Sequence, residues 1–366
     1  MNIKIKILMI GPLDKTGGVA NHTVHLANAL RNADADIVLY NSSFEEDLPS
    51  FLVNILKIYR RTLGLLCFLL RNRSTFDILH VQSSGWLAGF IDALTCTFCI
   101  SALNGKKFIV TFHHSNTKEF LEAHERIMGL VLKSTNKFIV VSHQQEKALK
   151  NAFPNASNIK VIPNGYDPYL FRFLDKSLSR KRLNLPQKAK IILNIANLEE
   201  YKGQKYLIQS MKNVLASDHD AMLCIVGKGS LLKELRLLID NSLCKENILL
   251  AGGNKPREEI PIWMNACDVF VLPSLSEGNP TVMFEALGCG KPFVGTNVGG
   301  IPEIIINDKL GILVEPMDAN GLAEAISTAL HSKWDAEYIR DYARKFTWDR
   351  IAEELLNVYE KILKEK

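Results

Sequence analysis

The sequence lacks the features of disulfide-bonded or membrane-spanning chains. Its seven cysteines follow no framework spacing, which indicates reduced thiols. The one Cys-x-x-Cys pair, Cys96 and Cys99, lies in an apolar helical context without a second pair, so core packing is the better interpretation. The best candidate for a membrane span, Trp86 to Leu103, is interrupted by Asp92 and lies between two strand-like runs. We therefore expect a buried crossover helix there.

The chain also lacks a strong charge excess, internal repeats and low-complexity tracts. A net charge of +5 spread over 366 residues gives no case for a nucleic-acid partner. No period of 20 to 50 residues is present. Residues 3–10 begin with alternating apolar and basic types and then turn continuously apolar. This apolar run is too short for the core of a signal peptide, so we expect a strand and a cytoplasmic protein.

Patterns for metal ligation and for a serine nucleophile are weak. Two Asp-x-Asp pairs, at 34–36 and 218–220, precede strand-like runs, whereas a metal site in such folds lies at the carboxyl end of a strand. His22 and His25 share a helix face without an intervening glutamate, which predicts histidines on the helix surface. No Gly-x-Ser-x-Gly elbow is present. We expect no metal.

What the chain does contain is a regular alternation of strand and helix patterns. Many of the strand-like runs are continuously apolar, as expected of parallel strands covered on both faces. The sequence predicts two doubly wound, Rossmann-like α/β domains, 1–165 and 170–346, facing a cleft that is the natural ligand site. The last helix, about 348–366, could pack back on the first domain. Strand-like runs lie near 3–10, 36–40, 77–81, 107–112, 137–141, 159–162, 190–196, 221–226, 247–251, 268–272, 292–295 and 310–314.

Two glutamates, Glu277 and Glu285, follow the apolar run 269–273. Asn279 is typical of a helix N-cap and Pro280 of a first helical position. The free N–H groups of Thr281 and Val282 would then suit an anion at the helix N-terminus. Glu285 lies in an apolar, hence buried, helix, where a carboxylate needs polar partners such as sugar hydroxyls.

Other strand-to-helix junctions could approach a phosphate. Gly17 and Gly18 open the first helix pattern, and a plain turn is the alternative. The loop Gly227-Lys228-Gly229 imitates a dinucleotide fingerprint, but Leu232 occupies the position of the third glycine, which argues against a dehydrogenase.

Two more side chains lie at predicted helix openings or strand ends. Lys202 could meet a diphosphate as a point charge, with a solvated lysine as the alternative. His113 and His114 end an apolar strand, and spacing does not decide which imidazole points toward the cleft.

Together these motifs resemble the retaining nucleotide-sugar glycosyltransferases of family 4, which have the GT-B architecture. The resemblance covers nearly the whole chain and rests on the order and spacing of several short motifs. They are Gly17-Gly18-Val19, Pro163-Asn164-Gly165, Lys202-Gly203, the Glu-x7-Glu of Glu277 and Glu285, Gly288-Cys289-Gly290-Lys291-Pro292 and Gly299-Gly300-Ile301-Pro302-Glu303.

The resemblance implies a role for each matching residue. Glu277 would contact hydroxyls of the transferred sugar, Glu285 the ribose, and His113 the other side of the sugar. Lys202 would neutralise the diphosphate. Asn197 stands where many members carry an arginine, which leaves more of that charge to Lys202. The implied catalytic set is Glu277, His113 and Lys202, and the implied donor-binding set is Gly17, Gly18, Asn197, Lys202, Gly227, Gly278, Asn279, Pro280, Thr281, Val282 and Glu285.

The implied reaction is transfer of a sugar from a UDP- or GDP-sugar to a glycan or lipid-linked acceptor, with retention and without a metal or other cofactor, in cell-surface polysaccharide or glycolipid synthesis. No dedicated nucleophile is evident, so we expect front-face attack by the acceptor. The alternatives are a non-catalytic nucleotide-sugar or glycan-binding protein and a sugar-nucleotide epimerase.

A basic, apolar segment bears on the acceptor. The run 63–70 is apolar, and such a helix with basic flanks could rest on the inner face of an anionic membrane as a peripheral contact. A core helix with solvated ends explains it equally well. The flanking cations are Lys57, Arg60, Arg61, Arg71 and Arg73.

Overall fold

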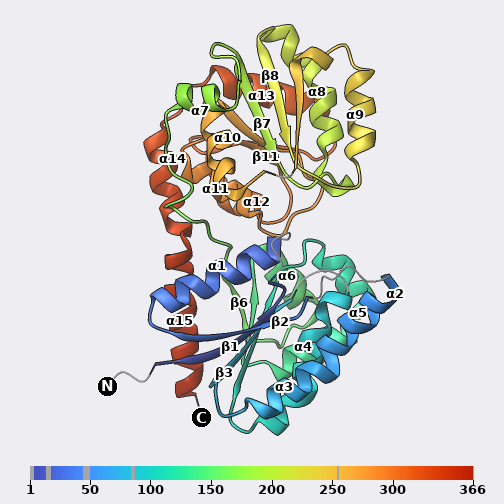
Figure 1. Ribbon diagram of the computed structural model, residues 1–366, viewed down its shortest axis with the longest axis vertical. Helices are drawn as coiled ribbons and strands as arrows, with labels where there is room; N and C mark the ends of the chain where they lie inside the picture. The colour runs from blue at the N-terminus through green and yellow to red at the C-terminus, as the bar shows by residue number, and fades with distance from the viewer. Residues whose placement is uncertain (1–3, 14–17, 44–49, 84–86, 254, 366) are drawn as a thin grey trace. The chain divides into compact units, whose positions relative to one another are not determined.

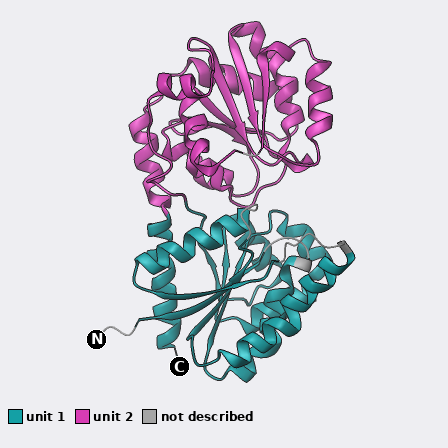
Figure 2. Ribbon diagram, viewed as in Figure 1, with its two compact units in different colours: residues 1–165, 348–366 teal, residues 166–347 magenta. Residues whose placement is uncertain are grey.

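The computed structural model describes residues 4–13, 18–43, 50–83, 87–253 and 255–365. The chain divides into two compact units (Figure 2). The first comprises Met1–Gly165 together with Trp348–Lys366, and the second comprises Tyr166–Thr347. In its described residues, each unit is built on one six-stranded sheet whose paired strands are parallel (Figure 1).

The first unit has the strand order β2-β1-β3-β4-β5-β6. Its strands are β1 (Lys6–Gly11), β2 (Asp36–Asn41), β3 (Ile78–Ser83), β4 (Lys107–Phe112), β5 (Lys137–Val140) and β6 (Ile159–Val161). Its helices are α1 (Gly18–Asn32), α2 (Ser50–Tyr59), the π-helix η1 (Arg60–Gly64), α3 (Leu65–Arg71), α4 (Leu87–Cys99), η2 (Ile100–Leu103), α5 (Thr117–Ser134), α6 (His143–Ala152) and α15 (Trp348–Lys364).

Alternate residues of β1 point to opposite, covered faces of this sheet. Ile7 and Met9 pack in one cluster with α1 and α15, and Leu8 and Ile10 pack in another with α3, α4 and α5 (Figure 1). The buried side of α15 has helical spacing, and each fully buried aliphatic side chain contributes about 1.5–3 kcal/mol. The last helix is therefore part of the first unit's core. Its buried residues are Trp348, Ile351, Ala352, Leu355, Val358, Tyr359 and Ile362.

The two points where the chain passes between the units are formed by neighbouring residues. Within the first unit, a Cβ on Gly165 would lie 2.8 Å from the Trp348 ring, so only glycine fits there. Within the second unit, the Tyr166 N–H donates to the Phe346 carbonyl at 3.0 Å, and Tyr166 and Thr347 form an isolated parallel β-bridge.

The second unit has the strand order β12-β11-β10-β7-β8-β9. This is the Rossmann order, in which the direction of winding reverses between the adjacent strands β7 and β10. Its strands are β7 (Lys190–Ile195), β8 (Ala221–Val226), β9 (Ile248–Gly252), β10 (Val269–Leu272), β11 (Phe293–Thr296) and β12 (Gly311–Val314). Its helices are α7 (Lys176–Arg182), η3 (Glu200–Lys202), α8 (Gln204–Ser217), α9 (Leu232–Asp240), η4 (Lys245–Asn247), η5 (Arg257–Glu259), α10 (Ile260–Ala266), α11 (Thr281–Gly288), α12 (Ile301–Ile304), α13 (Ala319–His331), α14 (Ala336–Ala343) and η6 (Arg344–Phe346).

The predicted doubly wound α/β fold is confirmed, and every predicted strand-like run forms a strand with ends within a few residues. The run 86–103 contains α4, which connects β3 to β4, and Cys96 and Cys99 are buried in its core cluster. Among the described residues, no helix is long and apolar enough to cross a membrane. The prediction for His22 is wrong: it is buried in the unit, because it packs against Trp348 of α15.

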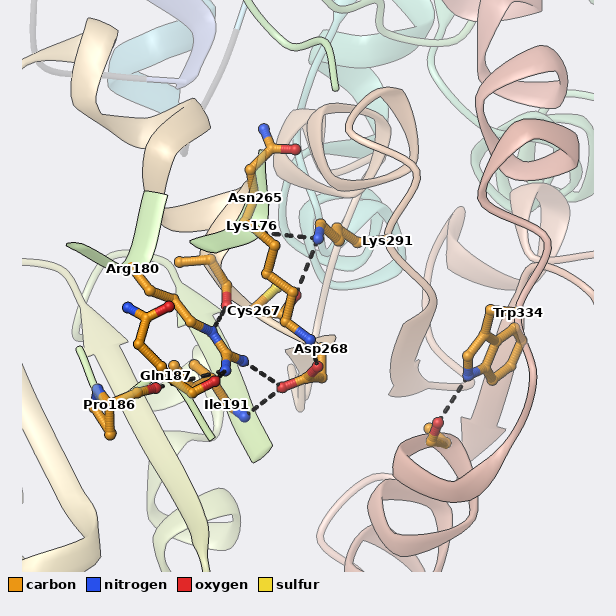
Figure 3. Close-up of polar contacts among 12 residues, drawn as sticks. Lys176, Arg180, Pro186, Gln187, Ile191, Asn265, Cys267, Asp268, Lys291 and Trp334 are labelled. Carbon is orange, nitrogen blue, oxygen red and sulfur yellow. Dashed lines mark hydrogen bonds and ion pairs between the residues drawn. The ribbon is translucent and has the colours of Figure 1, made fainter. Parts of the chain in front are cut away.

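A buried polar cluster anchors α7 to the amino end of the second sheet (Figure 3). Arg180, only 2% exposed, donates to the carbonyls of Ala266 and Gln187 at 2.9 and 2.7 Å and to Asp268 Oδ2 at 2.7 Å. Lys291 donates to two carbonyls at the end of α10, both at 3.0 Å. These cations satisfy carbonyl groups that would otherwise be buried without partners.

We predict that Arg180→Met destabilises the protein by about 3 kcal/mol or more, because it leaves buried acceptors unpaired. Lys176→Met is the matched control: Lys176 pairs with the same carboxylate, Asp268, but is 47% exposed, so its loss should cost at most about 1 kcal/mol. The thermal unfolding midpoints of the full chain check both values. Equal shifts for the two variants would contradict the anchoring role of Arg180.

Candidate active site

Loops at the carboxyl edge of the second sheet pack backbone to backbone through glycines. A Cβ on Gly203, at φ 67°, would lie 2.1 Å from the Pro273 carbonyl oxygen. One on Gly299, at φ 59°, would lie 1.8 Å from the Glu277 carbonyl oxygen, and one on Gly227 would lie 2.0 Å from that of Ala196. Any larger residue would therefore push these loops apart. The packing fixes the loops that follow β7, β8, β10 and β11 against one another.

This packing brings Lys202 and Glu277 together, from the loops after β7 and β10. The Lys202 ammonium lies 2.6 Å from Glu277 Oε1, and the Ser274 hydroxyl donates to the same oxygen at 2.7 Å. The two side chains are 15% and 6% exposed, so water screens the pair poorly. In the described part of the chain, no donor to Glu277 Oε2 is recorded. The carboxylate thus has one oxygen held by the protein and one available for a ligand hydroxyl.

The N-terminus of α11 begins four residues after Glu277. Here one prediction is wrong: the N-cap is Pro280, in extended conformation with ψ 119°, and helical geometry begins at Thr281 rather than at Pro280. The shift of one residue leaves the main feature in place. For Thr281 and Val282, the structure records no backbone N–H acceptor among the residues that it describes. Gly278 in the same loop accepts the Gly300 N–H at 2.8 Å, and the Asn279 side chain is buried.

Glu285 occupies a more apolar place on α11. It is buried as predicted, and burial raises the pKa of its carboxyl to about 7, against the opposing effect of Arg257. The Arg257 Nη2 atom lies 3.5 Å from Glu285 Oε1, and the guanidinium lies over the Phe171 ring, 5.5 Å from its centroid. The sequence offered no signal that paired Arg257 with Glu285, because the two residues come from separate elements.

The remaining predicted residues of this unit lie on neighbouring loops. The Asn197 side chain is exposed, and its carbonyl accepts the Gln204 amide at 2.9 Å. Gly227 donates its N–H to the Gly252 carbonyl at 3.1 Å. The loops after β7 and β8 are joined by the Leu198 N–H and the Lys228 carbonyl at 2.9 Å. Asn197 and Gly227 are therefore close to the glycine-packed edge but make no recorded contact with Glu277.

In the first unit, His113 follows β4 at the carboxyl edge of the sheet. Its Nε2 atom lies 2.9 Å from Gln82 Oε1, and its ring packs edge-on against His22 at 4.4 Å between centroids. An amide oxygen only accepts hydrogen bonds, so Nε2 of His113 carries the proton and Nδ1 keeps its lone pair. Burial lowers the pKa of His113 to about 3, which keeps the ring neutral. His114 instead packs its ring against Phe112 and Phe120.

A chain of buried hydrogen bonds extends from His113 to the last helix. Gln82 Nε2 lies 3.2 Å from His80 Nε2, and His80 Nδ1 lies 2.6 Å from the Tyr359 hydroxyl on α15. Of the glycine pair predicted to open the first helix, the structure describes only Gly18. Gly18 begins α1, where an added Cβ would meet nothing within 4 Å, and Gly17 lies outside the described residues.

The described residues contain no group of three or more His, Cys, Asp or Glu side chains that could hold a metal ion. The Asp-x-Asp pairs have other partners: Asp34 binds Lys4 at 2.8 Å, and Asp218 pairs with Lys190.

Comparison with known proteins identifies the two halves of the chain. Residues 16–169 match the family model "Glycosyltransferase Family 4", and residues 175–346 match "Glycosyl transferases group 1". A glycosyltransferase of Methanocaldococcus jannaschii is 32% identical over 301 residues, which are 78% of this chain and 75% of the relative.

Two further similar proteins are known with nucleotide sugars. The Escherichia coli UDP-Gal:alpha-D-GlcNAc-diphosphoundecaprenol alpha-1,3-galactosyltransferase is 25% identical over 348 residues, 88% of this chain and 87% of that protein. The structure of Anabaena HepE in complex with UDP-glucose superposes with a TM-score of 0.77 at 20% identity, covering 98% of this chain and 100% of that chain. The second match shows the fold alone. From the family models and the 32% identical relative, we conclude that the chain belongs to the family-4 glycosyltransferases and is a glycosyltransferase of the GT-B fold.

Proposed function

We propose that the enzyme transfers a hexosyl or related sugar from a nucleotide-diphosphate sugar to a glycan or lipid-linked acceptor, with retention of anomeric configuration, in cell-surface polysaccharide or glycolipid synthesis. The observation that carries the proposal is the Lys202–Glu277 pair beside the N-terminus of α11. It combines a cation, a carboxylate oxygen and backbone N–H groups at the strand-order reversal, where open α/β sheets bind ligands.

The donor would bind with its diphosphate at the N–H groups of Thr281 and Val282. A helix N-terminus favours anions through its free N–H groups and its dipole. Lys202 has three ammonium donors, of which Glu277 uses one, so the others can reach phosphate oxygens. The diphosphate charge would thus be balanced by the protein, and we propose that no metal is required. UDP is the favoured nucleotide because two of the similar proteins are named with UDP-sugars.

Each remaining side chain has a role in the transfer. Glu277 Oε2 would accept a hydroxyl of the transferred sugar, and Glu285 would accept the ribose hydroxyls. His113 would use Nδ1 to accept a hydroxyl from the other side of the sugar. Departure of the nucleotide diphosphate develops negative charge, which Lys202 and the α11 N–H groups stabilise. The acceptor would then attack from the face that the diphosphate leaves. A trapped glycosyl–enzyme adduct in mass spectrometry would contradict this route.

A surface of the first unit supports a membrane-linked acceptor. Along α2, η1 and α3, large apolar side chains are exposed, with Phe51 at 70% and Leu63 at 60%. Basic residues occur in the same segment, and cations together with exposed apolar side chains favour binding to anionic bilayers. We propose that this segment rests on the cytoplasmic face of a membrane. The exposed apolar residues are Phe51, Leu52, Ile55, Ile58, Tyr59, Leu63 and Leu70.

Thermal-shift titration with UDP, GDP and ADP, with and without EDTA, tests the donor. A nucleotide at a hundred times its dissociation constant should stabilise the protein by about 2.7 kcal/mol. We expect UDP to give the largest shift and EDTA to leave it unchanged. Absence of a shift with all three nucleotides would refute the proposed donor site. A shift without release of nucleotide from UDP-sugars would instead indicate a binding protein.

We predict that Lys202→Ala and Glu277→Ala each lower the transfer rate by about 10²–10³-fold, because each removes a charge aimed at the reacting groups. Nucleotide release from radiolabelled UDP-sugars measures the rate. Lys202→Ala leaves a buried carboxylate without its cation, so the thermal unfolding midpoint of each variant is recorded alongside its rate. Glu277→Gln is measured as well, because it keeps the shape of the side chain and removes only its charge.

The matched control is the exposed pair of Lys205 and Glu200, 4.0 Å apart in the same segment. Alanine at either position should leave the rate within twofold. Full activity in the Lys202 or Glu277 variants would remove these residues from the mechanism.

We predict that donor binding tightens by about tenfold between pH 6 and pH 8. The pKa of Glu285 is about 7 in the free protein, so the acid form dominates at pH 6 and the carboxylate that accepts ribose hydroxyls dominates at pH 8. The same shift means that, without ligand, this group's contribution to stability falls as pH rises from 4.5 to 7, because the folded state holds the proton more tightly. Calorimetric titration with a UDP-sugar, whose diphosphate has no ionisation in this range, measures the affinity, and Glu285→Gln should abolish the pH dependence. An unchanged profile in that variant would contradict the role.

We predict that the protein sediments with vesicles of phosphatidylglycerol and phosphatidylcholine at low salt and less with phosphatidylcholine alone. High salt should weaken the binding by screening the basic residues. Ile55→Glu with Ile58→Glu should abolish it, whereas Leu243→Glu, at a 93% exposed leucine of the second unit, should not. Equal sedimentation of both variants would refute this docking surface.

A further inference from the structure

A groove of about 680 Å³ lies between α5 and α6 of the first unit. It begins at Ser115, two residues after His113, and follows α6 as far as Ala152. The strands β4 and β5 that precede these helices are adjacent and parallel, so both helix N-termini lie at the sheet's carboxyl edge. Its volume is in the range of pockets that bind organic ligands, about 300–1,000 Å³. None of the residues proposed above for the donor lines it.

The groove is lined by apolar residues and by polar residues of both charges. Leu121, Ala148 and Ala152 form apolar lining, and Lys118, Glu122, Glu125, Lys147 and Asn151 contribute polar groups. Among the described residues, no hydrogen bond or ion pair is recorded for these five polar side chains.

Some other residues of the same segments are paired. Glu119 binds Asn116, and Glu146 binds Lys150 at 2.7 Å. The five polar side chains of the lining thus have no recorded partner within the ranges that the structure describes and can meet a ligand.

The end of the groove nearest His113 is held by Gln145. Its side-chain amide donates to the His114 carbonyl at 2.6 Å, and its oxygen accepts the Val141 N–H at 2.8 Å. Gln145 is itself buried, so its contacts fix the loop that carries both histidines against the start of α6. The groove therefore begins at a loop that Gln145 fixes against α6, two residues after His113.

We propose that this groove binds a neutral oligosaccharide segment of the acceptor, beyond the residue that receives the sugar. This inference rests on the proposed function, since it gives that reaction's acceptor a second contact. Sugars present apolar C–H faces together with hydroxyls that both donate and accept, which matches a lining that combines apolar side chains with ammonium, carboxylate and amide groups. The lining lysines, Lys118 and Lys147, are balanced by Glu122 and Glu125, so the groove offers no net positive charge to a polyphosphate or sulfated chain.

The test is binding of the fluorescently labelled full-length protein to a printed array of neutral, sulfated and phosphorylated glycans. Wild type should bind a subset of the neutral glycans. Ala148→Trp, which fills the groove, should lower that signal at least tenfold. Ala123→Trp is the matched control, because Ala123 is exposed on α5 and does not line the groove, and it should bind like wild type.

A second variant guards against misfolding of Ala148→Trp. Lys147→Ala with Asn151→Ala removes polar groups without filling space, and it should weaken glycan binding while the thermal midpoint stays within a few degrees of wild type. Failure of wild type to bind any neutral glycan, preference for charged glycans, or unchanged binding by Ala148→Trp would each overturn the proposal.

The UDP thermal shift, measured on the same preparations, separates this proposal from the proposed function. Glycan binding lost in Ala148→Trp but no UDP shift in wild type would retain the groove and refute the donor site. A UDP shift without glycan binding would do the reverse.

Discussion

The candidate active site depends on the close approach of backbone segments at the carboxyl edge of the second sheet. Gly203, Gly227 and Gly299 each place the chain where a side chain would collide with a neighbouring carbonyl. The loops after β7 and β10 are neighbours because the strand order reverses between those strands. The strand order therefore determines which loops are neighbours, and glycine, which has no side chain, allows their backbones to come into contact. Only with both conditions does the Lys202 ammonium reach the Glu277 carboxylate, 75 residues further along the chain.

The two glutamates of the Glu-x7-Glu motif differ in environment and hence in chemistry. Glu277 is buried but has a cation and a hydroxyl on one oxygen, so its charge is compensated before any ligand arrives. Glu285 has only the more distant Arg257, and burial raises its pKa. A carboxylate that is already compensated suits an electrostatic role at the reacting sugar. A carboxyl group with a pKa near 7 instead gains its missing hydrogen-bond partners from the hydroxyl groups of a ligand.

Much of the fold was predictable because both faces of each sheet are covered. Residues such as Ile7 to Ile10 must all be apolar, and such runs are visible without knowledge of their partners. Local signals also indicate Glu277, which follows a strand, Lys202, which precedes a helix, and Glu285, which lies in an unusually apolar helix. What could not be predicted depends on distant contacts. The helix pattern places His22 on a surface, whereas its burial is caused by Trp348, more than 300 residues later. Arg257 approaches Glu285 only through the packing of separate elements.

The return of α15 to the first unit has a consequence for how this protein can be taken apart and recombined. In topological terms, the second unit is an insertion into the first, with both of its ends at neighbouring residues, Tyr166 and Thr347. A fragment that stops at residue 165 would lose seven buried residues of α15, together with the Tyr359 hydroxyl that ends the hydrogen-bond chain from His113. A chimera that takes its second unit from a relative therefore needs two junctions. Residues 1–165 and 348–366 must then come from the same protein, because they form one unit.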